Sequence, residues 1–239
     1  MPKGNPDAQK STASGAKFEI TAKGNGEKVK PGQGLKMRYA IFRPTGELLD
    51  CTERNNDFHI AGTLESLPYP WLGELAAELE IGGTLRAEVP QKLYPNPRAD
   101  TVWELQLVGV SDVPQFRKCD PAKLKTTGSG LIYEVIEQGT GASPTAADTV
   151  TAHYTGWLLE NGKMFDSSHA RGEPTEFPLG GVIKGWTEGL QLMQVGGKYL
   201  FTIPASLGYG ERGAPPTIPA NATLVFLVEL VSIKGNEKK

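Results

Sequence analysis

The sequence is poor in the residues that build metal sites, disulfide frameworks and membrane spans. It has two cysteines, Cys51 and Cys119, and three histidines, and their positions show no metal-ligand spacing. No apolar run approaches the roughly 18 residues that a membrane helix needs. We therefore expect no metal, no other cofactor, no disulfide and no membrane partner.

An excess of charge of one sign is also lacking. The 239 residues include 25 basic and 27 acidic side chains, for a net charge of −2. Binding to nucleic acid or to an anionic membrane would favour a strong basic excess, so we expect neither partner. Residues 1–16 are polar and lack the apolar core of a secretory signal, which favours a cytoplasmic protein. Neither terminus shows a dimerisation helix, so we expect a monomer.

Constellations for nucleophilic catalysis and phosphate binding are missing as well. Asp166, Ser167 and His169 are the residue types of a catalytic triad, but as near neighbours in sequence they are not expected to align as one. The Gly-x-Gly pairs at 24–26 and 139–141 lack the third glycine and the following helix of a dinucleotide site. We interpret both pairs as turns between strands.

An internal repeat is present. Tyr39 corresponds to Tyr154, and Pro90 corresponds to Pro204, at nearly the same offset. Beyond Pro90 the first copy is shorter, because it lacks the run 209–219 of the second copy.

This repeat predicts two related domains. We expect a disordered tail over residues 1–15, a first domain over 16–113, an exposed linker over 114–125, and a second domain over 126–239. The linker contains prolines and several charges, as exposed connections commonly do.

Local patterns predict the same architecture in both halves. Val150 and Ala152 alternate with polar residues, as in a half-buried strand. Trp186, Leu190 and Met193 share one face of a short helix. Many strands and one helix in about a hundred residues predict an α+β domain, with an antiparallel sheet packed on a helix.

A scattered set of apolar and aromatic residues in the second copy carries the functional signal. It comprises His153-Tyr154-Thr155-Gly156, Phe165-Asp166-Ser167-Ser168, Val182-Ile183, Gly185-Trp186, Tyr209-Gly210 and Ala222-Thr223-Leu224-Val225-Phe226. A site of this composition binds an apolar ring in a dry pocket. Over residues 130–233 the sequence resembles the FKBP family, the macrolide-binding peptidyl-prolyl cis-trans isomerases. The resemblance implies two twisted antiparallel half-barrel sheets, each wrapped around one short helix.

The resemblance also implies an isomerase site in the second domain. Trp186 would form the floor under a proline ring, Tyr209 would donate a hydrogen bond at the rim, and Asp166 would position groups rather than act as a base. The implied site residues are Tyr154, Phe165, Asp166, Val182, Ile183, Trp186, Tyr209, Ile218 and Phe226. Taken singly, each of the apolar ones is more simply explained as ordinary core.

Two positions depart from the family pattern. Ala214 stands in the flap where a histidine is frequent, and Thr175 stands at a wall position where phenylalanine is frequent. These changes bear on the affinity for macrolide ligands, which are candidate partners beside proline-containing polypeptide clients.

The first copy keeps Tyr39 and Asp50, but Leu49, Leu72 and Trp103 replace pocket residues. We expect a filled or shallow pocket there and no isomerase activity. Three functions therefore remain open for the chain. They are an isomerase that assists protein folding, a non-catalytic chaperone or partner-binding module, and a scaffold that recruits a partner after binding a macrolide.

Overall fold

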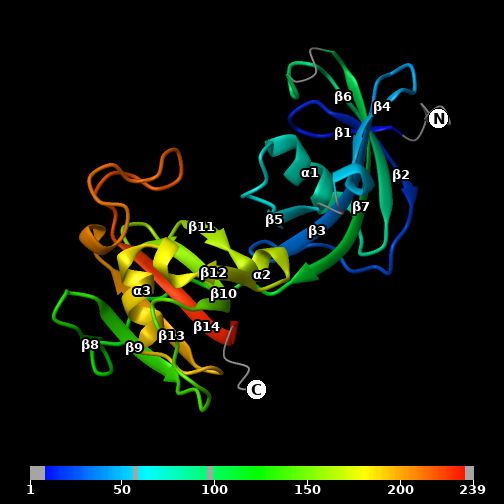
Figure 1. The fold of residues 1–239 in the computed structure, drawn as a ribbon. Coiled ribbons are helices and arrows are strands. Elements are labelled where there is room, and N and C mark those ends of the chain that lie inside the picture. The colour runs from blue at the N-terminus through cyan, green and yellow to red at the C-terminus, as the bar shows by residue number, and fades with distance from the viewer. Residues whose placement is uncertain (1–8, 56–58, 96–98, 235–239) are drawn as a thin grey trace. The chain divides into compact units, whose positions relative to one another are not determined.

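The protein is described by a computed structural model, which places residues 9–55, 59–95 and 99–234. These fall into two compact units (Figure 1). One contains the chain up to Val113 together with Ala170–Gly172, and the other contains Pro114–His169 and the chain from Glu173 onwards. None of the described helices is long and apolar enough to cross a membrane.

The first unit is an antiparallel sheet packed on one short helix, α1 (Pro70–Glu78). Its strands, in spatial order, are β1 (Lys10–Ser11), β2 (Lys17–Ala22), β6 (Thr84–Val89), β7 (Thr101–Ser111), β3 (Gly34–Phe42) and β4 (Leu48–Cys51), and β5 (Ile60–Thr63) also pairs with β3. A short 3-10 turn, η2 (Thr52–Asn55), follows β4. The core lies between the sheet and α1, where Trp71, Leu72 and Leu75 are fully buried.

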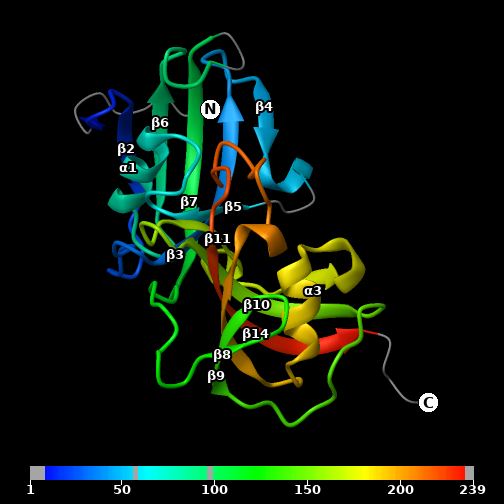
Figure 2. The same cartoon turned by 90° about the vertical axis from the view of Figure 1, so that its left-hand side faces the viewer.

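The second unit has the same strand order and packs on α3 (Lys184–Gln191) (Figures 1 and 2). Its strands, in spatial order, are β8 (Lys125–Thr126), β9 (Ile132–Glu137), β13 (Lys198–Ile203), β14 (Leu224–Lys234), β10 (Thr149–Leu158) and β11 (Met164–Ser167), and β12 (Thr175–Pro178) also pairs with β10. Short helical turns link these strands: α2 (Ser168–Arg171), η3 (Leu179–Gly181) and η4 (Ala205–Leu207). The predicted α+β class is therefore confirmed for both units.

Two glycines let α3 lie close to the sheet. A Cβ on Gly185 would stand 2.6 Å from Ile203 Cγ2, and a Cβ on Gly189 would stand 2.8 Å from Phe201 Cε1. Both distances are shorter than ordinary van der Waals contact, so larger residues would push the helix away. The close approach buries Trp186 and Leu190 against the strands, as their helical spacing predicts.

The prediction of a disordered tail over residues 1–15 is wrong for its last part. Residues 1–8 lie outside the described residues, but Lys10–Ser11 pairs with β2. Ser14 is also hydrogen-bonded to α1. Its N–H donates to Glu74 Oε2 at 3.0 Å, and its hydroxyl donates to Glu74 Oε1 at 2.7 Å. A sequence of small polar residues gave no sign of these pairings.

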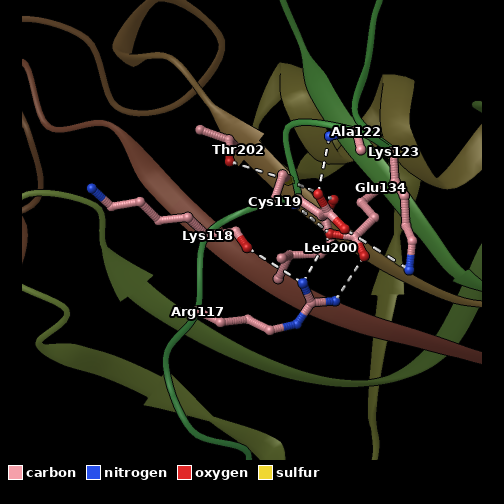
Figure 3. A network of polar contacts seen from close by, with 9 residues as sticks. Arg117, Lys118, Cys119, Ala122, Lys123, Glu134, Leu200 and Thr202 are labelled. Atoms are coloured by element: carbon pink, nitrogen blue, oxygen red, sulfur yellow. Dashed lines mark hydrogen bonds and ion pairs between the residues drawn. The ribbon is translucent and has the colours of Figure 1, made fainter.

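The segment predicted as an exposed linker, 114–125, packs in part on the second unit. Arg117 donates two hydrogen bonds to the buried Glu134 on β9, at 2.8 and 3.1 Å (Figure 3). Phe116 and Cys119 cover an apolar cluster on the outer face of the sheet, formed by Trp157, Leu200, Val225 and Leu227. Burial raises the pKa of the Cys119 thiol, which stays protonated beside the Leu200 carbonyl at 3.6 Å. The domain boundaries at residues 113 and 125 stay predictions.

Candidate functional site

A cavity of about 350 Å³ opens between α3 and the inner face of the second sheet. Such a volume lies at the lower end of the range of roughly 300–1,000 Å³ that is typical of small-molecule pockets. Its lining residues are Tyr154, Phe165, Asp166, Phe177, Gly181, Val182, Ile183, Trp186, Tyr209 and Phe226.

Trp186 forms the floor of this cavity. Ile183 is extended and α3 begins after it, so Trp186 lies in the first turn with its N–H bonded to Ile183 O at 2.9 Å. Three rings stand edge-on to its indole, with centroids 5.0–5.3 Å away, and they belong to Tyr154, Phe177 and Phe226. The indole Nε1 is buried and has no hydrogen-bond partner among the described residues. Buried donors without a partner are uncommon in folded proteins.

One wall of the cavity depends on a missing side chain. Phe165 and Phe226 meet edge to face, with ring centroids 5.4 Å apart. Gly156 on β10 lies behind them, and a Cβ there would stand 2.7 Å from atoms of both rings. Glycine at this position therefore allows the two rings to occupy the wall.

The polar side of the cavity holds a carboxylate and two phenols. The Tyr154 hydroxyl donates a short hydrogen bond to Asp166, which fixes the Tyr154 ring. Tyr209 is 41% exposed at the rim. Burial of its hydroxyl, and next the charge of Asp166, raise the pKa of Tyr209. The Tyr209 hydroxyl therefore remains protonated and can donate a hydrogen bond to a ligand at neutral pH.

The structure brings together eight of the nine predicted site residues. Ile218, the ninth, is buried in the core cluster and does not line the cavity. Its backbone exchanges two hydrogen bonds of 2.9 Å with Ala214 in the predicted flap. That these residues act in catalysis stays a prediction.

Two lining residues were missed, Phe177 and Gly181. Thr175 stands where phenylalanine is frequent in the family, and two residues further on Phe177 packs against both Trp186 and Tyr154. Phe177 and Thr175 lie on the same side of β12, two residues apart, and this alternation was the available signal.

In the first unit, aromatic rings occupy the corresponding interior. Trp71 and Tyr94 each stand edge-on to Trp103, with centroids 5.1 Å away. The Trp71 indole donates to Leu93 O at 3.0 Å. Leu72 follows Trp71 in α1 and is fully buried. Trp71 stands edge-on to Trp103 as Trp186 does to Phe226, so the expectation that Leu72 replaces this tryptophan is wrong. That the first unit has no isomerase activity stays a prediction.

Among the described residues, no three His, Cys, Asp or Glu side chains are grouped to hold a metal ion. The groups that line the cavity are phenols, one carboxylate, backbone amides and aromatic rings, which supply hydrogen bonds and desolvation.

Comparison with known proteins gives matches for the second unit. The family profile described as FKBP-type peptidyl-prolyl cis-trans isomerase matches residues 141–231. The FKBP-type peptidyl-prolyl cis-trans isomerase FkpA of Aeromonas hydrophila is 59% identical over 111 residues, which cover 46% of this chain and 41% of that protein. The FKBP-type 22 kDa peptidyl-prolyl cis-trans isomerase of Escherichia coli K12 is 57% identical over 110 residues, which cover 46% and 53% of the two chains.

A crystal structure of a peptidyl-prolyl cis-trans isomerase from Pseudomonas syringae pv. tomato is 37% identical, with a TM-score of 0.45, and the match covers 48% of this chain and 84% of that one. The chain spans about half the length of the curated relatives it matches.

Proposed function

We propose that the second unit, which belongs to the FKBP-type peptidyl-prolyl cis-trans isomerase family, accelerates rotation about X–Pro bonds in polypeptide clients. The observation that carries this proposal is the cavity of about 350 Å³ floored by Trp186 and walled by aromatic rings. Its size and its apolar lining suit a proline ring.

The mechanism follows from the electronic structure of the peptide bond. Partial double-bond character opposes rotation by roughly 18–20 kcal/mol. In the twisted amide this conjugation is broken and the carbonyl oxygen carries less charge, so the twisted form needs less hydration. A dry cavity therefore disfavours the planar ground state more than the transition state. Each 1.4 kcal/mol of this difference, roughly, gives a tenfold increase in rate.

The polar groups have supporting roles in this mechanism. The Tyr209 hydroxyl donates to a carbonyl of the client at the rim, and the backbone N–H of Ile183 donates to a second one. Asp166 holds the Tyr154 ring through its hydrogen bond and takes no proton from the client. No general base is required, because rotation transfers no proton.

The substitution Phe226→Tyr tests the cavity. The new hydroxyl would lie in a dry site without a partner, which costs about 1–3 kcal/mol, so kcat/KM for an X–Pro peptide should fall roughly tenfold or more. The matched control is Phe42→Tyr on β3 of the first unit, where the side chain is partly exposed. Exchange spectroscopy by NMR measures the rate without a coupled protease. An unchanged kcat/KM for Phe226→Tyr would show that the cavity is not the isomerase site.

The first unit supports a second function. Its equal strand order and its aromatic-filled interior favour a duplicated isomerase domain that has lost activity and binds clients or partners instead. A holdase assay on an unfolded protein, with Phe226→Tyr as the catalytically impaired chain, separates the two functions. Undiminished holdase activity in that variant would assign client binding outside the cavity.

We also propose macrolide binding, a monomeric state and a cytoplasmic location. The aromatic cavity supports the first, and two cysteines without a disulfide fit the reducing compartment of the last. Competition by rapamycin in the peptide assay tests macrolide binding directly.

A further inference from the structure

A single buried hydroxyl holds the backbone of Tyr154, whose ring lines the cavity. The Tyr154 N–H donates to Ser168 Oγ at 2.7 Å, and Ser168 Oγ donates back to Tyr154 O at 3.1 Å. Ser168 is fully buried. We call these two hydrogen bonds between Ser168 Oγ and the Tyr154 backbone the clamp. A hydroxyl has one proton and two lone pairs. The clamp uses the proton and one lone pair of Ser168 Oγ and leaves one lone pair for a third group.

Two stacked imidazole rings complete the clamp. His153 Nδ1 lies 3.0 Å from Ser168 Oγ, and His169 Nδ1 lies 3.3 Å from Tyr154 O. The His169 Nδ1 also lies 3.2 Å from Thr155 Oγ1. The centroids of the two rings are 4.7 Å apart. Both rings therefore contact the groups that fix the Tyr154 peptide, on the face of β10 opposite the cavity.

The charged groups around these rings form a row across the sheet. His153 on β10 lies directly opposite Glu229 on β14, which lies opposite Lys198 on β13. Lys198 pairs with the Glu229 carboxylate, and His169 Nε2 lies 3.6 Å from Glu229 Oε1. One carboxylate thus faces one ammonium and two imidazoles. Asp166, the carboxylate on neighbouring β11, is bonded to the Tyr154 hydroxyl on the cavity side.

This environment favours an uncharged His153. Burial is the largest cause that lowers the pKa of His153, the charge of His169 adds to it, and Glu229 opposes both. Although burial would raise the pKa of Glu229, its hydrogen bond and charge pairing with Lys198 lower it overall. The single negative charge is therefore already balanced by Lys198, and protonating His153 would add a positive charge that no further carboxylate balances.

The first unit contains the same clamp with different neighbours. Thr52, which is fully buried, accepts from the Tyr39 N–H at 2.9 Å and donates to Tyr39 O at 3.4 Å. Arg38 and Glu53 take the places of the two histidines. Backbone and side-chain hydrogen bonds, and then the charge of Arg38, lower the pKa of Glu53. This clamp is flanked by charges that do not change near neutral pH.

We propose that Ser168, His153 and His169 are positioning residues for the isomerase site, and that protonation of His153 lowers its rate in acidic solution. The inference rests on the proposed isomerase function. Protonation of His153 places a positive charge in a partly buried stack whose ring centroids are 4.7 Å apart, and the groups that hold the Tyr154 peptide move apart. The Tyr154 ring then leaves its place in the cavity wall.

The test replaces the two histidines beside Ser168 with the residue types that stand beside Thr52 in the first unit. The full-length chain carrying His153→Arg and His169→Glu is compared with the unchanged chain in NMR exchange measurements on an uncharged X–Pro peptide. We expect kcat/KM of the unchanged chain to fall about tenfold from pH 7.5 to pH 5, within the range where histidine titrates. The double variant should give a flat pH profile across this range, whatever its rate at pH 7.5. His59→Gln, which alters the third histidine in the first unit, is the control and should follow the unchanged chain.

Equal pH profiles for the double variant and the unchanged chain would overturn the proposal. If circular dichroism shows that the double variant is unfolded, the single substitution His153→Gln, which keeps a polar group without a titrating proton, replaces it. Its profile should be flatter than that of the unchanged chain, and an identical profile would likewise overturn the proposal.

A second readout does not depend on activity. The backbone amide of Tyr154 donates to Ser168, so its ¹⁵N shift should titrate with a histidine midpoint in the unchanged chain and stay constant in the variant. A constant shift in the unchanged chain would contradict the clamp. A chain that is inactive at every pH but shows this titration would contradict the proposed function and leave the clamp supported.

Discussion

Gly156 shows at the residue scale how an absent side chain shapes the cavity. The Phe165 and Phe226 rings approach the β10 backbone so closely that a Cβ on Gly156 would stand 2.7 Å from each. The backbone at this glycine does not require a positive φ. Glycine is therefore needed for space and not for conformation.

The substitution Gly156→Ala should displace one or both rings into the cavity. Overpacking of this kind costs about 1–3 kcal/mol, and we expect a loss of roughly tenfold in kcat/KM while the unit stays folded. Gly128→Ala is the control, because a Cβ there has no neighbour within 4 Å. Peptide kinetics and thermal unfolding are measured together. Full activity in a folded Gly156→Ala chain would refute this account of the wall.

The resemblance to the FKBP family predicts most of the residues that line the cavity, because positions on paired strands and one helix converge in the same way wherever the fold is kept. The prediction fails where the exact position of a residue along its strand or loop decides what its side chain contacts. Phe177, and not Thr175, fills the wall, because both face the same side of β12 and only the end of that strand settles which one reaches Trp186. Ile218 is apolar and near the site, but its contacts direct it into the core.

At the element scale, the segment 114–120 packs on the second sheet without forming a strand of it. Glu134 on β9 accepts two hydrogen bonds from Arg117 and a third from the Asp120 N–H at 2.9 Å. The bonds from Arg117 are the largest cause that lowers the pKa of Glu134, and burial opposes them. Composition could not predict this attachment, because prolines and charges are also typical of free linkers.

The substitution Glu134→Gln should destabilise the second unit by about 1–3 kcal/mol, since hydrogen bonds to a buried charge are lost. Because the folded-state pKa of Glu134 lies below its unfolded value of about 4.3, its contribution is full above that pH and is lost as pH falls through the folded pKa. The variant should therefore lose less stability than the unchanged chain on acidification.

Glu137→Gln, an exposed change on the same strand, is the control for this experiment. Urea unfolding at pH 7 and pH 3.5 measures the difference. Equal free energies of unfolding for Glu134→Gln and the unchanged chain at pH 7 would show that the segment is not anchored there.

At the scale of the whole molecule, the segment 114–120 determines where the chain can be cut to give a stable second unit. A fragment of residues 126–239 lacks Phe116 and Cys119 and exposes Trp157, Leu200 and Leu227 on the outer face of the sheet. Exposed apolar patches promote association. We expect this fragment to unfold at a lower temperature and to aggregate more than a fragment of residues 114–239. Equal melting temperatures and equal solubility would contradict this boundary.

The account's central claim is that the cavity of the second unit is an X–Pro isomerase site. The most direct measurement is kcat/KM for an X–Pro peptide, determined by NMR exchange for the full-length chain and for residues 114–239. We predict the same value for both, because every residue of the cavity lies in the second unit. An active full-length chain with an inactive, folded fragment would place the activity elsewhere, and the absence of activity in both would contradict the isomerase assignment itself.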